Sequence, residues 1–482
     1  MKVTRHWAVR RSRMFEGIYG RLNSLLARSH LHERSLVSNR LAPFFVFGER
    51  HLKGLLFDCQ MCGQCILSST GMSCPANCPK LMRNGPCGGV RGDGRCEVDP
   101  EMRCVWVDAW DGSERMKKGG AISNIQPALD FRLRDTSAWL RSMSASSRPV
   151  PIMAHGELAL ARVAPTRPNR LKEVLHSGQF AVTAELSPPD SADPNDALRH
   201  ASVLAEVVDA INITDASGAN CHISSMSVAA LLVSKGLTPV MQLTCRDRNR
   251  IAIQGDILGA SALGISNLLC LTGDAIGSGD HPGAVAVCDL DSVSLLDAAR
   301  KMRDEGRFLS GRALSSRPDL FLGAAANPFS PPQRTRAAHL AKKVAAGAQF
   351  IQTQFCFDVP ALESFMVQVR DLGLDQRCFI LVGVGVLPSA RTARWMRSSV
   401  PGVHIPDHLI ERLEKAKDQR REGRQLCIEL IQQIHEVKGV AGVHVMAHRN
   451  EDLIADVIRA SGIRSTKSVI RAATAEVGEK RS

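Results

Sequence analysis

An alternation of short apolar runs with amphipathic stretches, which begins at Leu171, constrains the fold of this 482-residue chain more than any other feature. Eight apolar runs have the length and composition of strands: 180–186, 208–214, 239–244, 267–272, 320–325, 349–354, 378–384 and 442–446. Helical stretches such as 222–235 and 333–346 lie between them and end at Gly236 and Gly347, where glycine suits the left-handed cap. Eight strands that each precede a helical stretch predict an α/β fold, a closed (β/α)8 TIM barrel of about 290 residues. An open doubly wound sheet is the alternative, but no G-x-G-x-x-G follows the first strand.

Polar residues end or follow several of these strands, at the edge where a TIM barrel carries its chemistry. They are Glu185, Thr214, Asp215, Thr244, Asp274, Asn327 and Gln354, and Gly273 stands beside Asp274 in the same turn. Glu185 is the most informative of them, because a carboxylate within a buried strand is rare without a partner or a role. The alternative is that Glu185 only caps the turn at Pro188 and Pro189.

Eight cysteines lie within 46 residues near the start of the chain. Cys59, Cys62 and Cys65 form a C-x2-C-x2-C run suited to one iron-sulfur cluster, and prolines follow Cys74 and Cys78 as in ferredoxin-type ligation. Zinc is the alternative, because C-x2-C pairs also make tetrahedral sites. The sequence predicts a 4Fe–4S cluster or a zinc ion, with the candidate ligands Cys59, Cys62, Cys65, Cys74, Cys78 and Cys87. Eight thiols exceed the four that one site needs, so a second site or structural cysteines are expected.

The remaining composition narrows the cellular setting and the partners. The N-terminal residues lack the apolar core of a signal peptide and no run approaches a membrane span, so a cytoplasmic protein without a membrane partner is expected. In that reducing compartment the cysteine spacing favours a metal over disulfides. The net charge of +13 comes without a nucleic-acid recognition motif, and we expect it to serve an anionic cofactor or substrate.

These features divide the chain into five parts. Residues 1–55 form a basic helical lead-in and 56–140 a small metal-binding cysteine-rich domain, rich in Gly and Pro, where ligation replaces a conventional core. Residues 141–170 are a Ser-, Pro- and Ala-rich linker. The barrel occupies 171–465, and 466–482 are a tail.

Four strings of residues stand at the predicted strand ends: Glu185-Leu-Ser-Pro188-Pro189, Leu243-Thr244-Cys245-Arg-Asp, Leu271-Thr-Gly273-Asp274 and Thr353-Gln354-Phe355-Cys-Phe-Asp358. In this order and register they resemble the barrel of the 5,10-methylenetetrahydrofolate reductase family. The segment Asp58 to Gly89, with its Cys-Pro pairs, looks like the small domain that accompanies some bacterial reductases of this family. In some anaerobic one-carbon pathways a similar unit is a separate subunit with an iron-sulfur cluster; here the two parts are fused.

The resemblance implies FAD-dependent reduction of 5,10-methylenetetrahydrofolate to 5-methyltetrahydrofolate in one-carbon metabolism. Glu185 matches the family's general acid, Asp274 resembles the acid near the flavin pyrimidine edge, and Gln354 matches the glutamine that binds the pterin. The family's cofactor contacts correspond to Thr214, Asp215, Asn220, Thr244, Gly273, Asp274, Asn327 and Lys343. Lys343 and its neighbour Lys342 fall where the family places cations near the FAD phosphates, although a solvated helical face is the alternative.

Three positions depart from the pattern of the single-domain reductases. Gln242 replaces a histidine near the flavin, Asn327 replaces an aromatic residue, and Thr272 replaces an arginine. These changes leave the electron donor open between NAD(P)H and a low-potential electron-carrier protein that acts through the cysteine domain. Two further alternatives also stay open: oxidation of methyl-folate in a catabolic methyl-transfer pathway, and a zinc docking role for the cysteine domain. The sequence does not set the oligomeric state, and a homo-oligomer is one of the alternatives.

Overall fold

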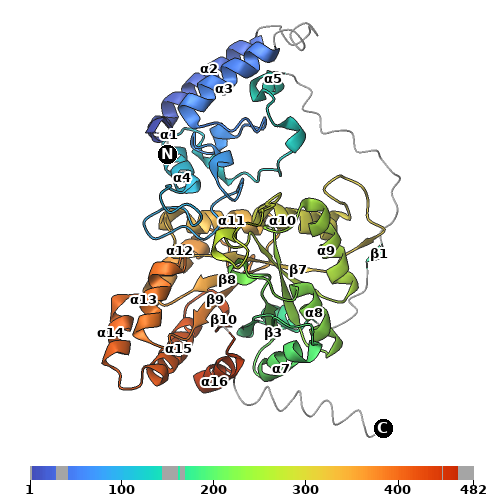
Figure 1. Ribbon diagram of the computed structural model, residues 1–482, viewed down its shortest axis with the longest axis vertical. Coiled ribbons are helices and arrows are strands. Elements are labelled where there is room, and N and C mark those ends of the chain that lie inside the picture. The colour runs from blue at the N-terminus through green and yellow to red at the C-terminus, as the bar shows by residue number, and fades with distance from the viewer. Residues whose placement is uncertain (1–2, 29–41, 144–160, 163–168, 448, 465–482) are drawn as a thin grey trace.

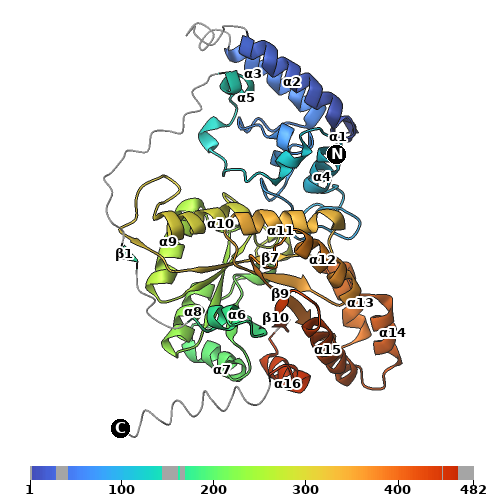
Figure 2. The same cartoon turned by 180° about the vertical axis from the view of Figure 1, so that it is seen from behind.

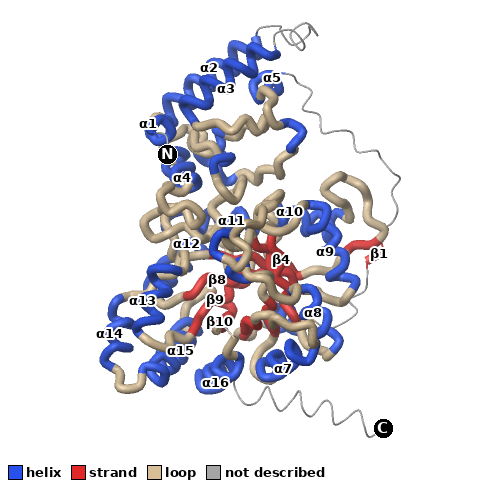
Figure 3. The backbone as a smooth tube through the Cα atoms, viewed as in Figure 1, coloured by secondary structure: helices blue, strands red, loops and turns tan. Residues whose placement is uncertain are grey.

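A computed structural model describes residues 3–28, 42–143, 161–162, 169–447 and 449–464. The chain forms two parts, a barrel and a smaller helical and loop-rich part that sits on one end of it (Figures 1 and 2). The smaller part contains the cysteine cluster and, as Figure 3 shows, is built mostly from loops between its helices.

The barrel contains eight parallel strands that close in the order β10-β2-β3-β4-β5-β7-β8-β9. They are β2 (Ala181–Leu186), β3 (Ala210–Ile213), β4 (Pro239–Thr244), β5 (Asn267–Leu271), β7 (Phe321–Ala326), β8 (Phe350–Phe355), β9 (Phe379–Gly385) and β10 (Val440–Met446). Each lies within two residues of a predicted strand. The predicted closed barrel is therefore confirmed, and the open-sheet alternative is wrong.

Helices surround this barrel, as expected for a parallel sheet with crossover connections. They are α6 (Arg170–His176), α7 (Pro194–Ala205), α8 (Ser225–Ser234), α9 (Arg250–Ala262), α10 (Ser292–Arg300), α11 (Arg336–Ala345), α12 (Val359–Asp371), α13 (Ala390–Ser399), α14 (Asp407–Lys415), α15 (Gln419–His435) and α16 (Glu451–Ser461). Gly236 and Gly347 follow α8 and α11 with positive φ angles of 75° and 120°, as predicted for helix ends.

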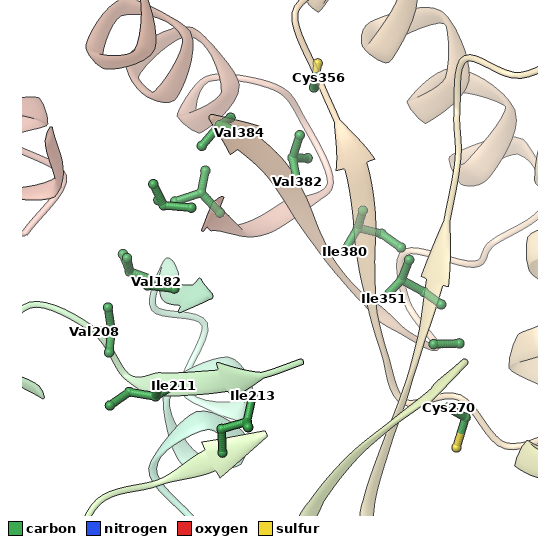
Figure 4. Close-up of a cluster of buried hydrophobic side chains, with 14 of the residues drawn as sticks. Val182, Val208, Ile211, Ile213, Cys270, Ile351, Cys356, Ile380, Val382 and Val384 are labelled. Atoms are coloured by element: carbon green, nitrogen blue, oxygen red, sulfur yellow. The ribbon is translucent and has the colours of Figure 1, made fainter. Parts of the chain in front are cut away.

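Alternation along the strands divides the core into two layers. Outward-facing residues such as Val182, Ile211 and Val384 pack against the helices, and Figure 4 shows part of this layer. Inward-facing residues at the amino ends of the strands, among them Phe321 and Phe350, pack against α6. This apolar plug fills one end of the barrel, so the interior is open to a ligand only at the carboxyl ends of the strands.

The smaller part holds α1 (Val3–Arg10), α2 (Ser12–Arg28), α3 (Ala42–Phe57), α4 (Val105–Ser113) and α5 (Ala138–Met143). The predicted lead-in, residues 1–55, packs on the cysteine segment, because its Ala8 and Phe15 join Phe57, Met72 and Cys74 in one apolar cluster. A second apolar cluster surrounds the buried Trp106. The expectation that ligation replaces a core is thus wrong, since apolar side chains of the cysteine segment and of the lead-in form two buried clusters.

Two predicted segments lie largely or wholly outside the described residues. Within the predicted linker, β1 (Ala161–Arg162) pairs in parallel with β6 (Ser316–Arg317), and most of the other residues are not described. The predicted tail 466–482 is not described at all. In the described part of the chain, no helix has the length and apolarity needed to cross a membrane.

Candidate functional site

A cavity of about 320 Å³ opens at the carboxyl ends of the barrel strands, beneath the cysteine-rich part. Strand ends and the loops after them supply most of its wall, including Glu185, Thr214, Thr244, Asp274 and Gln354. The cysteine-rich part supplies the rest, from Lys80, Cys87, Gly88, Gly89 and Glu97. Two segments far apart in the sequence therefore share one site of a size typical for a small ligand.

Two carboxyl groups lie on this wall. Burial and, to a smaller extent, the negative charge of Asp274 raise the pKa of Glu185 to about 7. The Glu185 carboxyl has no hydrogen bond or ion pair with any described residue, whereas the Asp274 carboxylate accepts a hydrogen bond from the Gly218 N–H at 2.7 Å. The raised pKa and the lack of a side-chain partner make Glu185 a candidate proton donor to a ligand in this cavity. The alternative in which Glu185 caps the Pro188–Pro189 turn has no hydrogen bond to support it.

Asp215 and Thr244 are engaged with each other. The Thr244 N–H and hydroxyl both donate to Asp215 Oδ2 at 2.9 Å. Arg248 adds two hydrogen bonds to the same carboxylate, at 2.6 and 3.2 Å. This network ties the ends of β3 and β4 together, so the Asp215 carboxylate and the Thr244 hydroxyl are engaged with protein groups.

Several polar atoms inside the barrel have no partner among the described residues. They are the Thr214 hydroxyl, both amide atoms of Asn212 and the Gln352 Oε1. Thr214 and Gln352 line the cavity, as does Gln354, whose Oε1 accepts from the Phe355 N–H at 3.0 Å. Buried polar groups without partners are costly, so these atoms favour a polar ligand in the cavity.

Helix α11 contributes cations to the same wall. Arg336 and Lys343 are both buried and line the cavity, yet they donate only to backbone carbonyls of Ser330, Pro331 and Ala325. No carboxylate of the described residues lies within ion-pair distance of either, and burial lowers the pKa of Lys343 to about 8. Buried cations without counter-ions indicate an anionic ligand group. Lys342 points elsewhere and donates to the Ile122 carbonyl of the cysteine-rich part at 2.9 Å.

Two predicted contacts are differently placed. Asn327 lines the cavity, but its Nδ2 donates to the carbonyls of Gly88 and Gly402 at 3.1 and 2.9 Å, so it joins the two parts of the chain. Asn220 does not line the cavity and its Nδ2 bonds to the Ser217 carbonyl of its own loop. Gly273 lines the cavity through its backbone.

The eight clustered cysteines form two groups of four, so the six candidate ligands divide between two pockets. Cys59, Cys62, Cys65 and Cys74 line one small pocket. Cys78, Cys87, Cys96 and Cys104 line another, and Cys87 also reaches the barrel cavity. All fifteen cysteines are free thiols. Within the described ranges, no three His, Cys, Asp or Glu side chains converge closely enough to hold a metal ion.

Lys80, Glu97 and Arg336 are cavity residues that the sequence alone did not identify. Lys80 stands in a Cys78-Pro-Lys80 string and Glu97 follows Cys96, which are signals of the cysteine segment and not of the barrel. Docking of the two parts brings the Lys80 and Glu97 side chains to the site, whereas Arg336 reaches it from α11 of the barrel.

Two protein-family models match this chain. The family model described as "Methylenetetrahydrofolate reductase" matches residues 170–462, more than half of the chain. A second model, described as "Methylene-tetrahydrofolate reductase C terminal", matches residues 39–132, which precede the barrel here.

Individual relatives are distant. A probable methylenetetrahydrofolate reductase (NADPH) of Caenorhabditis elegans is 24% identical over 50% of this chain and 35% of its own length. Methylenetetrahydrofolate reductase 2 of Saccharomyces cerevisiae is 26% identical over 52% of this chain and 41% of its own length. The chain thus spans less than half the length of these curated relatives. A solved Clostridium thermocellum protein that binds two copies of 5-methyl-5,6,7,8-tetrahydrofolic acid is 14% identical, and the match covers 61% of this chain and 98% of that protein. Its TM-score of 0.43 is too low to bear on function.

Proposed function

Because the chain belongs to the methylenetetrahydrofolate reductase family, whose model covers residues 170–462, we propose that it reduces 5,10-methylenetetrahydrofolate to 5-methyltetrahydrofolate. The observation that carries this proposal is Glu185, an acid with a pKa of about 7 and a free carboxyl on the cavity wall. The reaction needs such an acid, since the bridged folate accepts a hydride only after its five-membered ring opens to an iminium cation. Ring opening requires a proton on the departing nitrogen, and Glu185 supplies it.

Asp274 and Gln354 complete the substrate site in this proposal. Burial is the main cause that keeps Glu185 protonated, and the charge of Asp274 adds to it. The same charge favours the cationic folate over its neutral precursor. Gln354 lies on the same wall and offers an amide to the pterin ring. Gln352, deeper in the barrel, has an unpartnered Oε1 and is a second amide available to the ring.

The residues of the cavity also fit FAD as the cofactor, which when bound and reduced would supply the hydride. Lys343 and Arg336 are the buried cations without counter-ions that a pyrophosphate group requires. The unpartnered Thr214 hydroxyl offers a further polar contact. Asp215 and Thr244 contribute by bracing the strand edge, and Asn220 lies outside the cavity lining.

The test uses the full chain, purified anaerobically and supplied with FAD. The bound flavin is reduced with dithionite and mixed with 5,10-methylenetetrahydrofolate, and its reoxidation is followed by absorbance together with formation of 5-methyltetrahydrofolate. Stoichiometric reoxidation with product supports the proposal. A chain that binds no flavin, or a reduced flavin that the folate does not reoxidise, refutes it. Parallel reductions with NADH, NADPH and a low-potential donor identify the electron donor.

We further propose that Cys59, Cys62, Cys65 and Cys74 bind one metal centre, and that Cys78, Cys87, Cys96 and Cys104 form a second candidate set. Each group brings to one pocket four thiols, the number that a zinc ion or a 4Fe–4S cluster uses. Metal binding would have to draw these thiols together, because no three of them converge closely enough in the described residues. Metal analysis and an absorption spectrum of the anaerobic protein separate the two metals. Protein that lacks both iron and zinc would show that neither group is a metal site. If iron is present, loss of flavin reduction in Cys62→Ser supports an electron-transfer role, whereas lost partner binding with unchanged kinetics supports docking.

A further inference from the structure

The loop that carries Asp274 is held from outside the barrel. Lys80 of the cysteine-rich part donates from Nζ to the Gly273 carbonyl at 2.9 Å. Glu97, also of the cysteine-rich part, accepts from the Ala275 N–H through Oε1 at 3.1 Å. The two side chains therefore hydrogen-bond to the backbone of the residues immediately before and immediately after Asp274.

Lys80 and Glu97 also bind each other, with Nζ to Oε2 at 2.7 Å. Their side chains are only 8% and 11% exposed, so the pair is largely removed from water. A buried ion pair with further hydrogen bonds has a defined geometry, and removal of one partner leaves the other charge uncompensated. The pair is therefore a rigid clamp and not a solvated surface contact.

Other contacts dock the cysteine-rich part without touching this loop. Asp291 of the barrel accepts from the Arg83 N–H at 2.9 Å, and Lys342 reaches Ile122. Arg334 forms an exposed ion pair with Glu114 at 2.6 Å. Because the docking has these independent anchors, loss of the Lys80–Glu97 clamp does not by itself separate the two parts.

We propose that Lys80 and Glu97 are positioning residues of the active site, which hold the Asp274 turn and set the charge around it. The cysteine-rich part is then a required wall of the catalytic cavity, whatever metal it binds. This inference rests on the proposed function for the role of Asp274, but the clamp itself is tested independently of any flavin.

The first test is hydrogen–deuterium exchange of the full chain without added flavin. Glu97→Ala removes the acceptor of the Ala275 N–H, and we expect the amides of 272–276 to exchange about tenfold faster, as for one lost hydrogen bond to a charged group. Glu114→Ala removes an ion pair between the same two parts and is the matched control. Equal exchange of 272–276 in wild type and Glu97→Ala would overturn the proposal.

The second test separates charge from folding in the flavin-loaded protein. Lys80→Met removes a positive charge and should lower the midpoint potential of the bound flavin, whereas Glu97→Gln removes a negative charge and should raise it. Lys80→Arg should restore the wild-type potential more closely than Lys80→Met. The double variant Lys80→Met/Glu97→Met avoids an uncompensated buried charge, and it should stay folded with a lower kcat.

Shifts of the same sign in both single variants, or an unchanged kcat in the double variant, would refute the assignment. A wild-type protein without flavin or folate turnover would instead refute the proposed function and leave the exchange result intact.

Discussion

Replacement of Glu185 by Gln removes the proposed acid without a change of side-chain size. With a pKa of about 7, about half of the Glu185 carboxyls are protonated at pH 7, whereas at the ordinary value of 4.5 only about 0.3% would be. The cavity thus increases the protonated fraction about 150-fold at neutral pH. Loss of a positioned general acid typically costs about 10²–10⁴-fold in rate, and we expect kcat/KM of Glu185→Gln to fall by that factor.

The assay is kcat/KM for 5,10-methylenetetrahydrofolate as a function of pH, between about pH 5.5 and about pH 9. Because the protonated form acts, the wild-type rate should be flat below about pH 7 and fall about tenfold per unit above it. The rate of Glu185→Gln should lack this fall, the alkaline limb of the pH profile. Glu173→Gln, the same change on α6 at the opposite end of the barrel, should keep it. If Glu185→Gln protein keeps a limb with a midpoint near pH 7, another group is the acid.

The same pKa predicts a change in stability that needs no cofactor. The folded pKa lies above the unfolded value, so the folded state binds the extra proton and stability falls as pH rises from about 4.5 to about 7. The full shift corresponds to about 3.4 kcal/mol, and partial exposure to the cavity reduces it to about 1–3 kcal/mol. Urea unfolding should therefore show Glu185→Gln more stable than wild type at pH 8 by that amount, with the difference absent near pH 4.5. Equal differences at both pH values would contradict a raised pKa.

Three further predictions concern the cofactor, the thiols and the core. Lys343→Met should purify with less bound flavin than wild type, whereas Lys342→Met, which points to the cysteine-rich part, should not; flavin absorbance per chain measures both. Cys62→Ser should lower the metal content of the protein, and Cys427→Ser, a buried thiol of α15, should leave it unchanged in elemental analysis. Phe350→Ala at the barrel plug should lower the free energy of unfolding by about 3–5 kcal/mol in urea, and a loss below about 1 kcal/mol would refute the packing described for that end.

Much of the barrel and of its chemistry could be predicted from local pattern. Apolar runs such as 239–244 form strands because every residue of β4 is buried between the helices and the interior. Glu185 could be singled out because a carboxyl at a strand end has few structural uses, and the cavity lies there. The role of Asn220 was not foreseeable in the same way, because its loop turns the side chain toward Ser217 instead of the cavity.

The cysteine segment shows the limit of such reasoning. Spacing along the chain indicates which thiols are near in sequence, but it does not separate Cys74 from Cys78, which join different groups only four residues apart. Nor does it predict that lead-in residues such as Phe15 contribute to the apolar core around Cys74. These arrangements depend on packing between segments, which leaves no periodic signal.

Strand and helix periodicities are local properties of the chain, so the amino-acid sequence was sufficient to predict the closed barrel, its eight strands and the carboxyl and amide groups at their ends. Three features come instead from packing in three dimensions: the cysteine-rich part covers the barrel mouth, the cysteines divide four and four, and Lys80 and Glu97 hold the turn of Asp274. The contact between Lys80 and Gly273 spans 193 residues of sequence. It exists because two separately packed parts meet, and no local pattern encodes where they meet.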